Sequence, residues 1–96
     1  MKEPRIYVDF NEMLEEDLVL FSKEDSKKDS AGNFVQLFEG LFVKIYMDDV
    51  DEAGNVDNLI AEGIVERNTI MEGWGSTAKW NCRIDKKGIY HESDIK

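Results

Sequence analysis

Apolar and polar residues alternate along several short segments, which is the pattern of half-buried β-strands. The alternation is clearest in segments 5–10, 41–47 and 77–85, and the consecutive apolar residues near the end of segment 17–22 indicate a buried strand. The alternating strands are expected to turn one set of side chains inward: Ile6, Val8 and Phe10; Leu41, Val43, Ile45 and Met47; and Ala78, Trp80, Cys82 and Ile84.

The stretch from Phe38 to Arg67 is expected to organise the fold. A type II turn at its start needs a residue with positive φ at its third position, and Gly40 supplies it. The strand 41–47 then leads into an acidic loop, 48–58, whose reversal is expected at Gly54-Asn55. On the returning strand, 59–67, the odd positions face inward, and the small residues among them, Ala61 and Gly63, indicate a crowded or strongly bent place such as a barrel corner.

The remaining segments carry weaker signals. Residues 11–16 are expected to form a turn or one helical turn, and 23–32 a solvated, mobile loop of alternating charge. Residues 33–38 are too few for a helix assignment, and 89–95 form a short closing segment. With short strands separated by polar turns, the fold class is all-β: a single domain over residues 1–96, built as a small barrel or meander of about five or six strands.

The residues before and after the turn at Gly40 resemble an SH3-like small barrel. The similar elements are Leu37-Phe38-Glu39-Gly40, the alternating strand that follows, and the closing pieces Gly88-Ile89 and Ser93-Asp94-Ile95, which would form a 3₁₀ turn and a last strand. Residues 6–10 are similar to the opening of eukaryotic SH3 domains. The resemblance implies architecture only. Because no tandem Trp follows the acidic loop, it does not imply binding of proline-rich peptides.

Composition and charge narrow the classes of partner. The 96 residues carry a net charge of −9, so phosphate backbones and anionic membrane surfaces repel the chain, and basic protein surfaces are favoured. The single cysteine, Cys82, cannot form an internal disulfide, and no apolar run is long enough to span a membrane. We therefore expect a cytoplasmic protein with no membrane partner.

The acidic loop has a partial likeness to a calcium-binding loop. Its carboxylates at Asp49, Asp51 and Asp57 match the first, third and ninth places of an EF-hand, and Gly54 matches the sixth. The fifth place is Ala53 and the twelfth, which requires a bidentate Glu, is Ile60. The residues on either side of the loop have the pattern of β-strands, whereas an EF-hand loop lies between helices. We therefore expect a solvated acidic hairpin with no metal site.

Candidate catalytic groups are few. Cys82 lies on the apolar face of its strand, whereas a reactive thiolate needs an exposed, electropositive setting. His91 is the only imidazole and has Glu92 and Asp94 nearby, but no nucleophile is identifiable beside it. The sequence thus favours a non-catalytic protein that needs no cofactor.

The outer face of strand 41–47 is the best candidate for a contact surface. Its aromatic side chains, together with a Trp held between glycines, would form an exposed patch rimmed by the acidic loop, as in protein-binding surfaces. The predicted partner-binding residues are Phe42, Tyr46, Trp74, Asp48, Asp49, Asp51 and Glu52. The partner is expected to be a protein with a basic or amphipathic surface.

Alternatives remain open for this surface. A curled barrel that buries both faces of the strand would place Phe42 and Tyr46 in the core. A nucleic-acid-binding barrel would use the cations on strand 77–85 and the turn after it, which are Lys79, Arg83, Lys86 and Lys87. A small enzyme would need His91 in a pocket.

Overall fold

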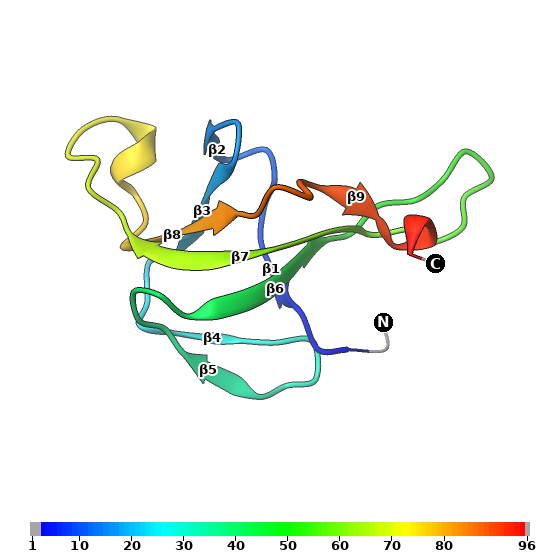
Figure 1. The fold of residues 1–96 in the computed structure, drawn as a ribbon, viewed down its shortest axis with the longest axis horizontal. Helices are drawn as coiled ribbons and strands as arrows, with labels where there is room; N and C mark the ends of the chain where they lie inside the picture. Colours follow the sequence, from blue (N-terminus) through cyan, green and yellow to red (C-terminus); the bar gives the residue numbers. More distant parts are fainter. Residues whose placement is uncertain (1–2, 96) are drawn as a thin grey trace.

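The computed structural model describes residues 3–95, which form nine short strands and two 3₁₀ helices (Figure 1). The elements are β1 (Ile6–Tyr7), β2 (Met13–Glu15), β3 (Leu18–Ser22), β4 (Ser26–Lys28), β5 (Phe34–Gln36), β6 (Phe42–Met47), β7 (Leu59–Arg67), η1 (Trp74–Ser76), β8 (Trp80–Ile84), β9 (Tyr90–His91) and η2 (Glu92–Asp94). Within residues 3–95, neither helical segment has the length or apolar character needed to cross a membrane. The predicted all-β class is confirmed.

Seven of the strands form one sheet. Six of them follow the order β1-β6-β7-β8-β3-β2, and the seventh, β9, pairs with β7. β1 lies parallel to β6, and the other pairs are antiparallel. β4 and β5 form a separate two-stranded sheet that lies below β6 in Figure 1. Because the end strands β1 and β2 do not pair, the sheet is not closed into a barrel. The predicted SH3-like barrel is therefore not confirmed.

β6 and β7 are neighbours in the sheet and contribute a row of side chains to the core. Val43 lies opposite Gly63, and Ile45 lies opposite Ala61. Antiparallel partners point to the same face, so this row packs inward as predicted. The core cluster comprises Ile6, Val8, Phe10, Val19, Phe21, Leu37, Val43, Ile45, Ala61, Val65, Trp80, Cys82 and Ile84.

The predicted crowding at Gly63 is confirmed. A Cβ atom there would lie 2.2 Å from the carbonyl oxygen of Arg83 and 2.8 Å from Sγ of Cys82. Glycine is thus required where β7 passes β8. The turn before β6 is also as predicted, with Gly40 at φ 96° and the amide of Leu41 donating to the carbonyl of Phe38.

Three predictions for the less regular segments were wrong. Residues 11–16 were expected to form a turn or one helical turn, and they contain β2 with turn residues on either side of it. The expected loop 23–32 contains β4. β4 pairs with β5, with Lys27 opposite Val35. Both strands of this pair are short and partly exposed, so neither shows a run of alternating apolar residues. At the C-terminus the expected order is reversed, because the short strand β9 precedes the 3₁₀ helix η2.

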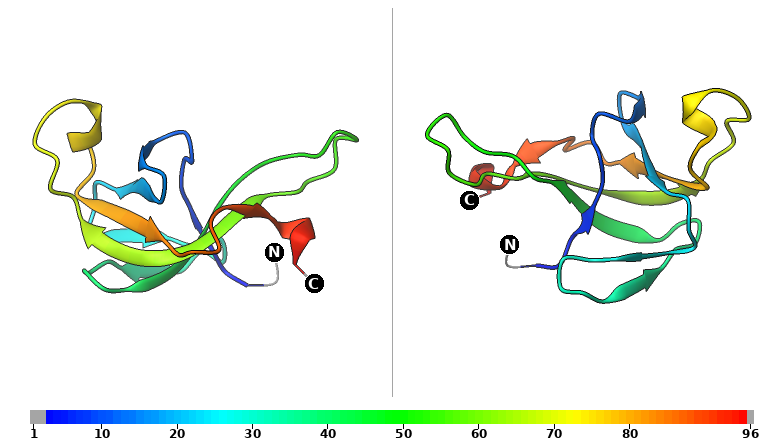
Figure 2. Two further views of the ribbon diagram at one scale, coloured as in Figure 1. Left: turned by 45° about the horizontal axis from the view of Figure 1, so that its top comes forward. Right: turned by 180° about the vertical axis from the view of Figure 1, so that it is seen from behind.

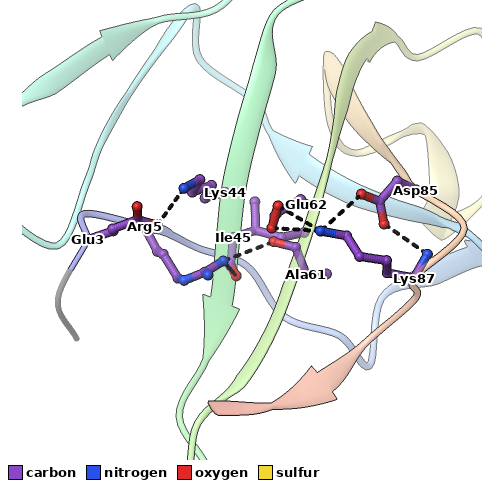
Figure 3. Close-up of polar contacts among 8 residues, drawn as sticks. All are labelled: Glu3, Arg5, Lys44, Ile45, Ala61, Glu62, Asp85 and Lys87. Atoms are coloured by element: carbon purple, nitrogen blue, oxygen red, sulfur yellow. Dashed lines mark hydrogen bonds and ion pairs between the residues drawn. The ribbon is translucent and has the colours of Figure 1, made fainter. Parts of the chain in front are cut away.

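Arg5 is buried, although the alternation placed it on the polar face. Its Nη1 atom donates to the carbonyl oxygens of Ala61 at 3.2 Å and Ile45 at 3.5 Å (Figure 3). A buried guanidinium is tolerated where backbone acceptors replace its water. Arg5 thus connects the start of β1 to β6 and β7.

Candidate interaction site

The acidic hairpin, residues 48–58, extends beyond the sheet between β6 and β7 (Figure 1). Its two arms are joined by a bridge between Val50 and Val56. The amide of Asp51 donates to the carbonyl of Asn55 at 2.8 Å, and Gly54 adopts φ 85° at the reversal. The predicted hairpin and its reversal point are confirmed.

The Asp51 side chain holds the tip of the hairpin together. Its Oδ1 atom accepts hydrogen bonds from the backbone amides of Ala53 and Asn55, each at 2.9 Å. This is the local side-chain to backbone pattern that Asp commonly forms in turns. Asp51 was predicted to contact a partner. In the structure its carboxylate accepts hydrogen bonds within the turn.

Asp49 is bonded to the C-terminal segment. Its Oδ2 atom lies 3.0 Å from Nε2 of His91 in β9. The hydrogen bond from His91 holds the pKa of Asp49 below its usual value, and the same bond raises the pKa of His91. His91 therefore lies beside a carboxylate that fixes the base of the hairpin.

A second set of bonds fastens the other arm. Asp57 accepts hydrogen bonds from the amide of Ser93 at 3.0 Å and from its hydroxyl at 2.8 Å. These two bonds hold the pKa of Asp57 below its usual value. Asn58 is buried between the arms, and its Oδ1 accepts from the amide of Asp49 at 3.3 Å. The 3₁₀ helix η2 thus acts as a fixed support for the hairpin.

The hairpin exposes two apolar side chains together with acidic ones. Val50 and Val56 are 59% and 75% exposed, and as bridge partners they point to the same side. Asp48 and Glu52 are exposed nearby in sequence. A shallow hollow is lined by Asp48, Asp49, Val50, Val56 and Asn58. Sequence reasoning missed the two valines, although their positions on either side of the reversal were a usable signal.

Tyr46 forms an aromatic pair next to the hairpin. Its ring packs edge to face against Tyr7 of β1, with centroids 5.7 Å apart. Burial raises the pKa of Tyr46, and the nearby charge of Asp48 adds to the effect. Tyr7 is 44% exposed and Tyr46 is half-buried, so the pair presents a ring surface on the outer face.

Phe42 lies at the other end of β6 and is also outside the core. It is 50% exposed and lies opposite Ile64, which is 41% exposed. The row between Phe42 and Tyr46 is polar, because Lys44 lies opposite Glu62. Lys44 pairs with Glu3, as Figure 3 shows. Phe42 and Tyr46 therefore belong to separate apolar patches.

Trp74 lies far from the acidic hairpin. Its 3₁₀ helix, η1, is at the opposite end of the molecule's long dimension in every view (Figures 1 and 2). Asn68 anchors this loop by donating to the carbonyls of Gly75 at 2.7 Å and Ala78 at 2.8 Å. Trp74 is 58% exposed. The structure does not bring the three predicted aromatic residues together.

Most cations of the strand face at β8 are engaged in ion pairs. Lys79 is 2.6 Å from Asp25, and Arg83 lies between Asp17 at 2.9 Å and Glu66 at 3.2 Å. Lys87 is 3.1 Å from Glu62 (Figure 3). This face is therefore a mixed-charge surface rather than a basic groove.

Cys82 is buried, as predicted. Burial raises the pKa of its thiol to about 12, with smaller contributions from the charges of Glu66 and Asp85. Such a thiol is protonated at neutral pH and is a poor nucleophile. Over residues 3–95, no group of three or more His, Cys, Asp or Glu side chains has the placement to hold a metal ion.

No family model matches the chain, and no curated protein or solved structure matches it either.

Proposed function

We propose that the protein is a non-catalytic interaction domain whose acidic hairpin binds a basic or amphipathic surface of another protein. The observation that carries this proposal is the exposed Val50–Val56 pair on a hairpin that also exposes Asp48 and Glu52. An apolar centre with a polar rim is the usual composition of protein-binding surfaces.

Charge and rigidity both support this role. The net charge of −9 favours encounter with a basic partner, and this steering weakens with salt because the Debye length is about 8 Å at physiological ionic strength. The hydrogen bonds made at the carboxylates of Asp51, Asp49 and Asp57 restrain the hairpin. Less conformational freedom is then lost on binding than for a flexible loop.

Fewer aromatic residues belong to the proposed surface than were expected from the sequence. Tyr46 and Tyr7 adjoin the base of the hairpin and extend the proposed surface. Phe42 with Ile64 forms a flanking patch on the same face, beyond the Lys44–Glu62 row. Trp74 lies at the end of the molecule opposite the hairpin and is not part of the proposed surface.

Binding to immobilised protein at two salt concentrations tests the proposal. Partners captured from a lysate in 50 mM salt should be depleted in about 500 mM salt, since screening at that concentration removes most long-range attraction. The variant Asp48→Asn/Glu52→Gln should reduce capture at low salt, and Val50→Ser/Val56→Ser should reduce it at both.

A matched control separates local contact from total charge. Glu39→Gln/Glu72→Gln removes the same two charges from exposed positions outside the hairpin. It should leave capture nearly unchanged. If the control and the hairpin variants weaken capture equally, only net charge matters and the hairpin is not the contact surface.

A cytoplasmic location fits the single buried thiol of Cys82, which needs no oxidising compartment. The SH3-like arrangement stays a prediction about architecture. The nucleic-acid alternative is weaker, because Lys79, Arg83 and Lys87 already pair with carboxylates.

A further inference from the structure

β5 is an edge strand that pairs on one side only within residues 3–95, because its two-stranded sheet contains β4 and no other strand. The amide of Leu37 donates to the carbonyl of Asp25 at the end of this antiparallel pair. Hydrogen-bonded positions alternate along such a pair, so Phe34 and Gln36 turn their amides and carbonyls away from β4. These backbone groups point to the free edge, and β5 lies at the outer limit of the fold (Figures 1 and 2).

The side chains on one face of this edge are exposed and largely aromatic. Phe34 is 73% exposed, and Phe38, two residues after β5 ends, is 54% exposed. Gln36 is exposed between them. Side chains alternate along extended backbone, so these three share one face, while Val35 and Leu37 pack against the core. The edge therefore presents free backbone groups and two large apolar side chains together.

The features that normally keep edge strands apart are missing at β5. Natural edges are blocked by charged side chains, proline or a bulge. Residues 33–38 contain no charged residue and no proline, although 34% of the chain is charged. The register of β4 with β5 is regular. β2, an end strand of the larger sheet, carries Glu15 and a register shift instead. The lack of protection is thus particular to β5.

β4 holds β5 in a fixed place on the molecule. The Nζ atom of Lys27 in β4 donates to the carbonyl of Phe21 in β3 at 2.7 Å. Just after β4, the amide of Ser30 donates to the carbonyl of Arg5 at 2.8 Å. A strand that pairs with β5 therefore meets a preformed edge, and less conformational freedom is lost than on pairing with a flexible segment.

The sequence of this edge is complementary to itself when two copies run antiparallel. With Gln36 of one copy opposite Gln36 of the other, Phe34 lies opposite Phe38, and the free backbone groups of the two edges meet. Aromatic cross-strand pairs stabilise antiparallel strands, and no like charges come to lie opposite each other, since Glu39 faces Asn33. A register shifted by one residue would oppose backbone groups that are already bonded to β4.

We propose that β5 is a self-association edge, through which two copies of the chain pair antiparallel about a two-fold axis at Gln36. The two-stranded sheets of both copies then join into one continuous sheet. The amide of Gln36 donates to the carbonyl of Gln36 in the second copy, and the amide of Phe38 donates to the carbonyl of Phe34 there. Such a contact uses the same surface on both copies and closes at the dimer.

Charge and size set the strength of this dimer. The contact is small and each copy carries a charge of −9, so we expect a dissociation constant on the order of 100 μM. Salt screens the repulsion between the copies, so association should strengthen as salt is added. Capture by the acidic hairpin has the opposite salt dependence. The edge is independent of the hairpin surface, and the two proposals can fail separately.

Sedimentation velocity of the full chain tests the edge. Between about 10 μM and about 1 mM the parent should change from monomer to dimer. The dimer should be more abundant in about 500 mM salt than in about 50 mM salt. A chain that stays monomeric at the highest concentration in both salts overturns the proposal, and β5 would then be free for a strand of another protein. Species larger than a dimer also contradict the closed two-fold contact.

Two charge variants locate the axis. Gln36→Lys and Gln36→Glu each place like charges opposite each other and should weaken association about tenfold. An equimolar mixture of the two should recover it, because opposite charges then face each other, and recovery also shows that both variants are folded. Asn11→Lys adds the same charge as Gln36→Lys at an exposed position outside this sheet and should associate like the parent. A mixture without recovery, or equal weakening in the two Lys variants, refutes the register.

Hydrogen exchange in the parent gives a test that needs no variant. The amide of Leu37 is bonded within the chain and should be protected at every concentration. The amides of Gln36 and Phe38 should become about fivefold better protected at about 1 mM, where about four-fifths of the chains are paired. A dimer that forms without added protection at these two amides has another interface and overturns the proposal.

Discussion

Asp49 and His91 are joined at 3.0 Å although they lie 42 positions apart in the sequence. Their bond connects the acidic hairpin to β9, and it raises the pKa of His91. The folded chain therefore binds a proton at His91 more tightly than the unfolded chain does. The contribution of this contact is fully present below the unfolded pKa near 6.5 and is lost as pH rises through the higher folded pKa.

The hairpin should accordingly be better protected at pH 6 than at pH 8.5. Amide hydrogen exchange of residues 48–58, corrected for the intrinsic effect of pH, measures this difference. Asp49→Asn should remove most of the pH dependence, because its hydrogen bond is the largest cause of the raised pKa of His91. Asp94→Asn, whose charge is a smaller cause, should retain most of it. Unchanged protection across this pH range in the parent protein would contradict the prediction.

The Asp51 carboxylate should matter for the shape of the hairpin more than for its charge. Asp51→Ala removes the acceptor for the amides of Ala53 and Asn55 and should increase hydrogen exchange at the tip severalfold, corresponding to about 1 kcal/mol. Glu52→Gln removes one charge at an exposed neighbouring position and should leave exchange unchanged. Equal exchange in the two variants would show that Asp51 does not hold the turn.

Gly63 and Gly75 should differ in their tolerance of a methyl group. At Gly63 the new Cβ meets the Arg83 carbonyl at 2.2 Å, and backbone cannot move without disturbing the β7–β8 pair. Gly63→Ala should cost about 3 kcal/mol or more. At Gly75 the close atom is the flexible end of Leu14, at 2.7 Å, so Gly75→Ala should cost about 1 kcal/mol. Urea unfolding measures both, and a milder effect at Gly63 than at Gly75 would refute the packing argument.

The strands β6 and β7 were predicted well from the sequence, because alternation of apolar and polar residues indicates a strand with one buried face. The strand 59–67 was expected with the same bounds as β7, and Ile45 and Val65 face the core as expected. Gly40 and Gly54 were placed correctly, since a reversal that needs positive φ leaves few other residues possible.

The periphery was harder to predict because long-range pairing decides it. β4 is polar and becomes a strand only through its partner β5. The burial of Arg5 depends on carbonyls of Ile45 and Ala61, which are 40 and 56 positions away. The separation of the predicted aromatic residues could not be predicted either. Alternation indicates which face of a strand a side chain occupies, but it does not indicate at which end of the sheet a distant loop lies.

Alanine variants of Phe42 and Ile45 test whether the outer face of β6 is exposed to solvent or belongs to the core. Ile45 is fully buried, and Ile45→Ala should cost about 2–5 kcal/mol of unfolding free energy. Phe42 is 50% exposed, and Phe42→Ala should cost less than about 1 kcal/mol. Chemical denaturation gives both values. A large loss for Phe42 would mean that this face is covered in solution, and any binding defect of the variant would then reflect unfolding.

The depressed pKa of Lys27 predicts how stability changes in mild alkali. Between pH 8 and 10.5 the folded chain carries fewer protons at Lys27 than the unfolded chain, so stability rises with pH in this window. The shift from 10.5 to about 8 corresponds to at most about 3 kcal/mol, and partial solvent access reduces this to about 1 kcal/mol. Urea unfolding at pH 7.5 and 9.5 measures the change. Lys27→Met, which carries no titrating group, should lose this increment, and Lys28→Met should keep it. An equal pH response in the parent and in Lys27→Met would mean that the amine stays charged in the fold.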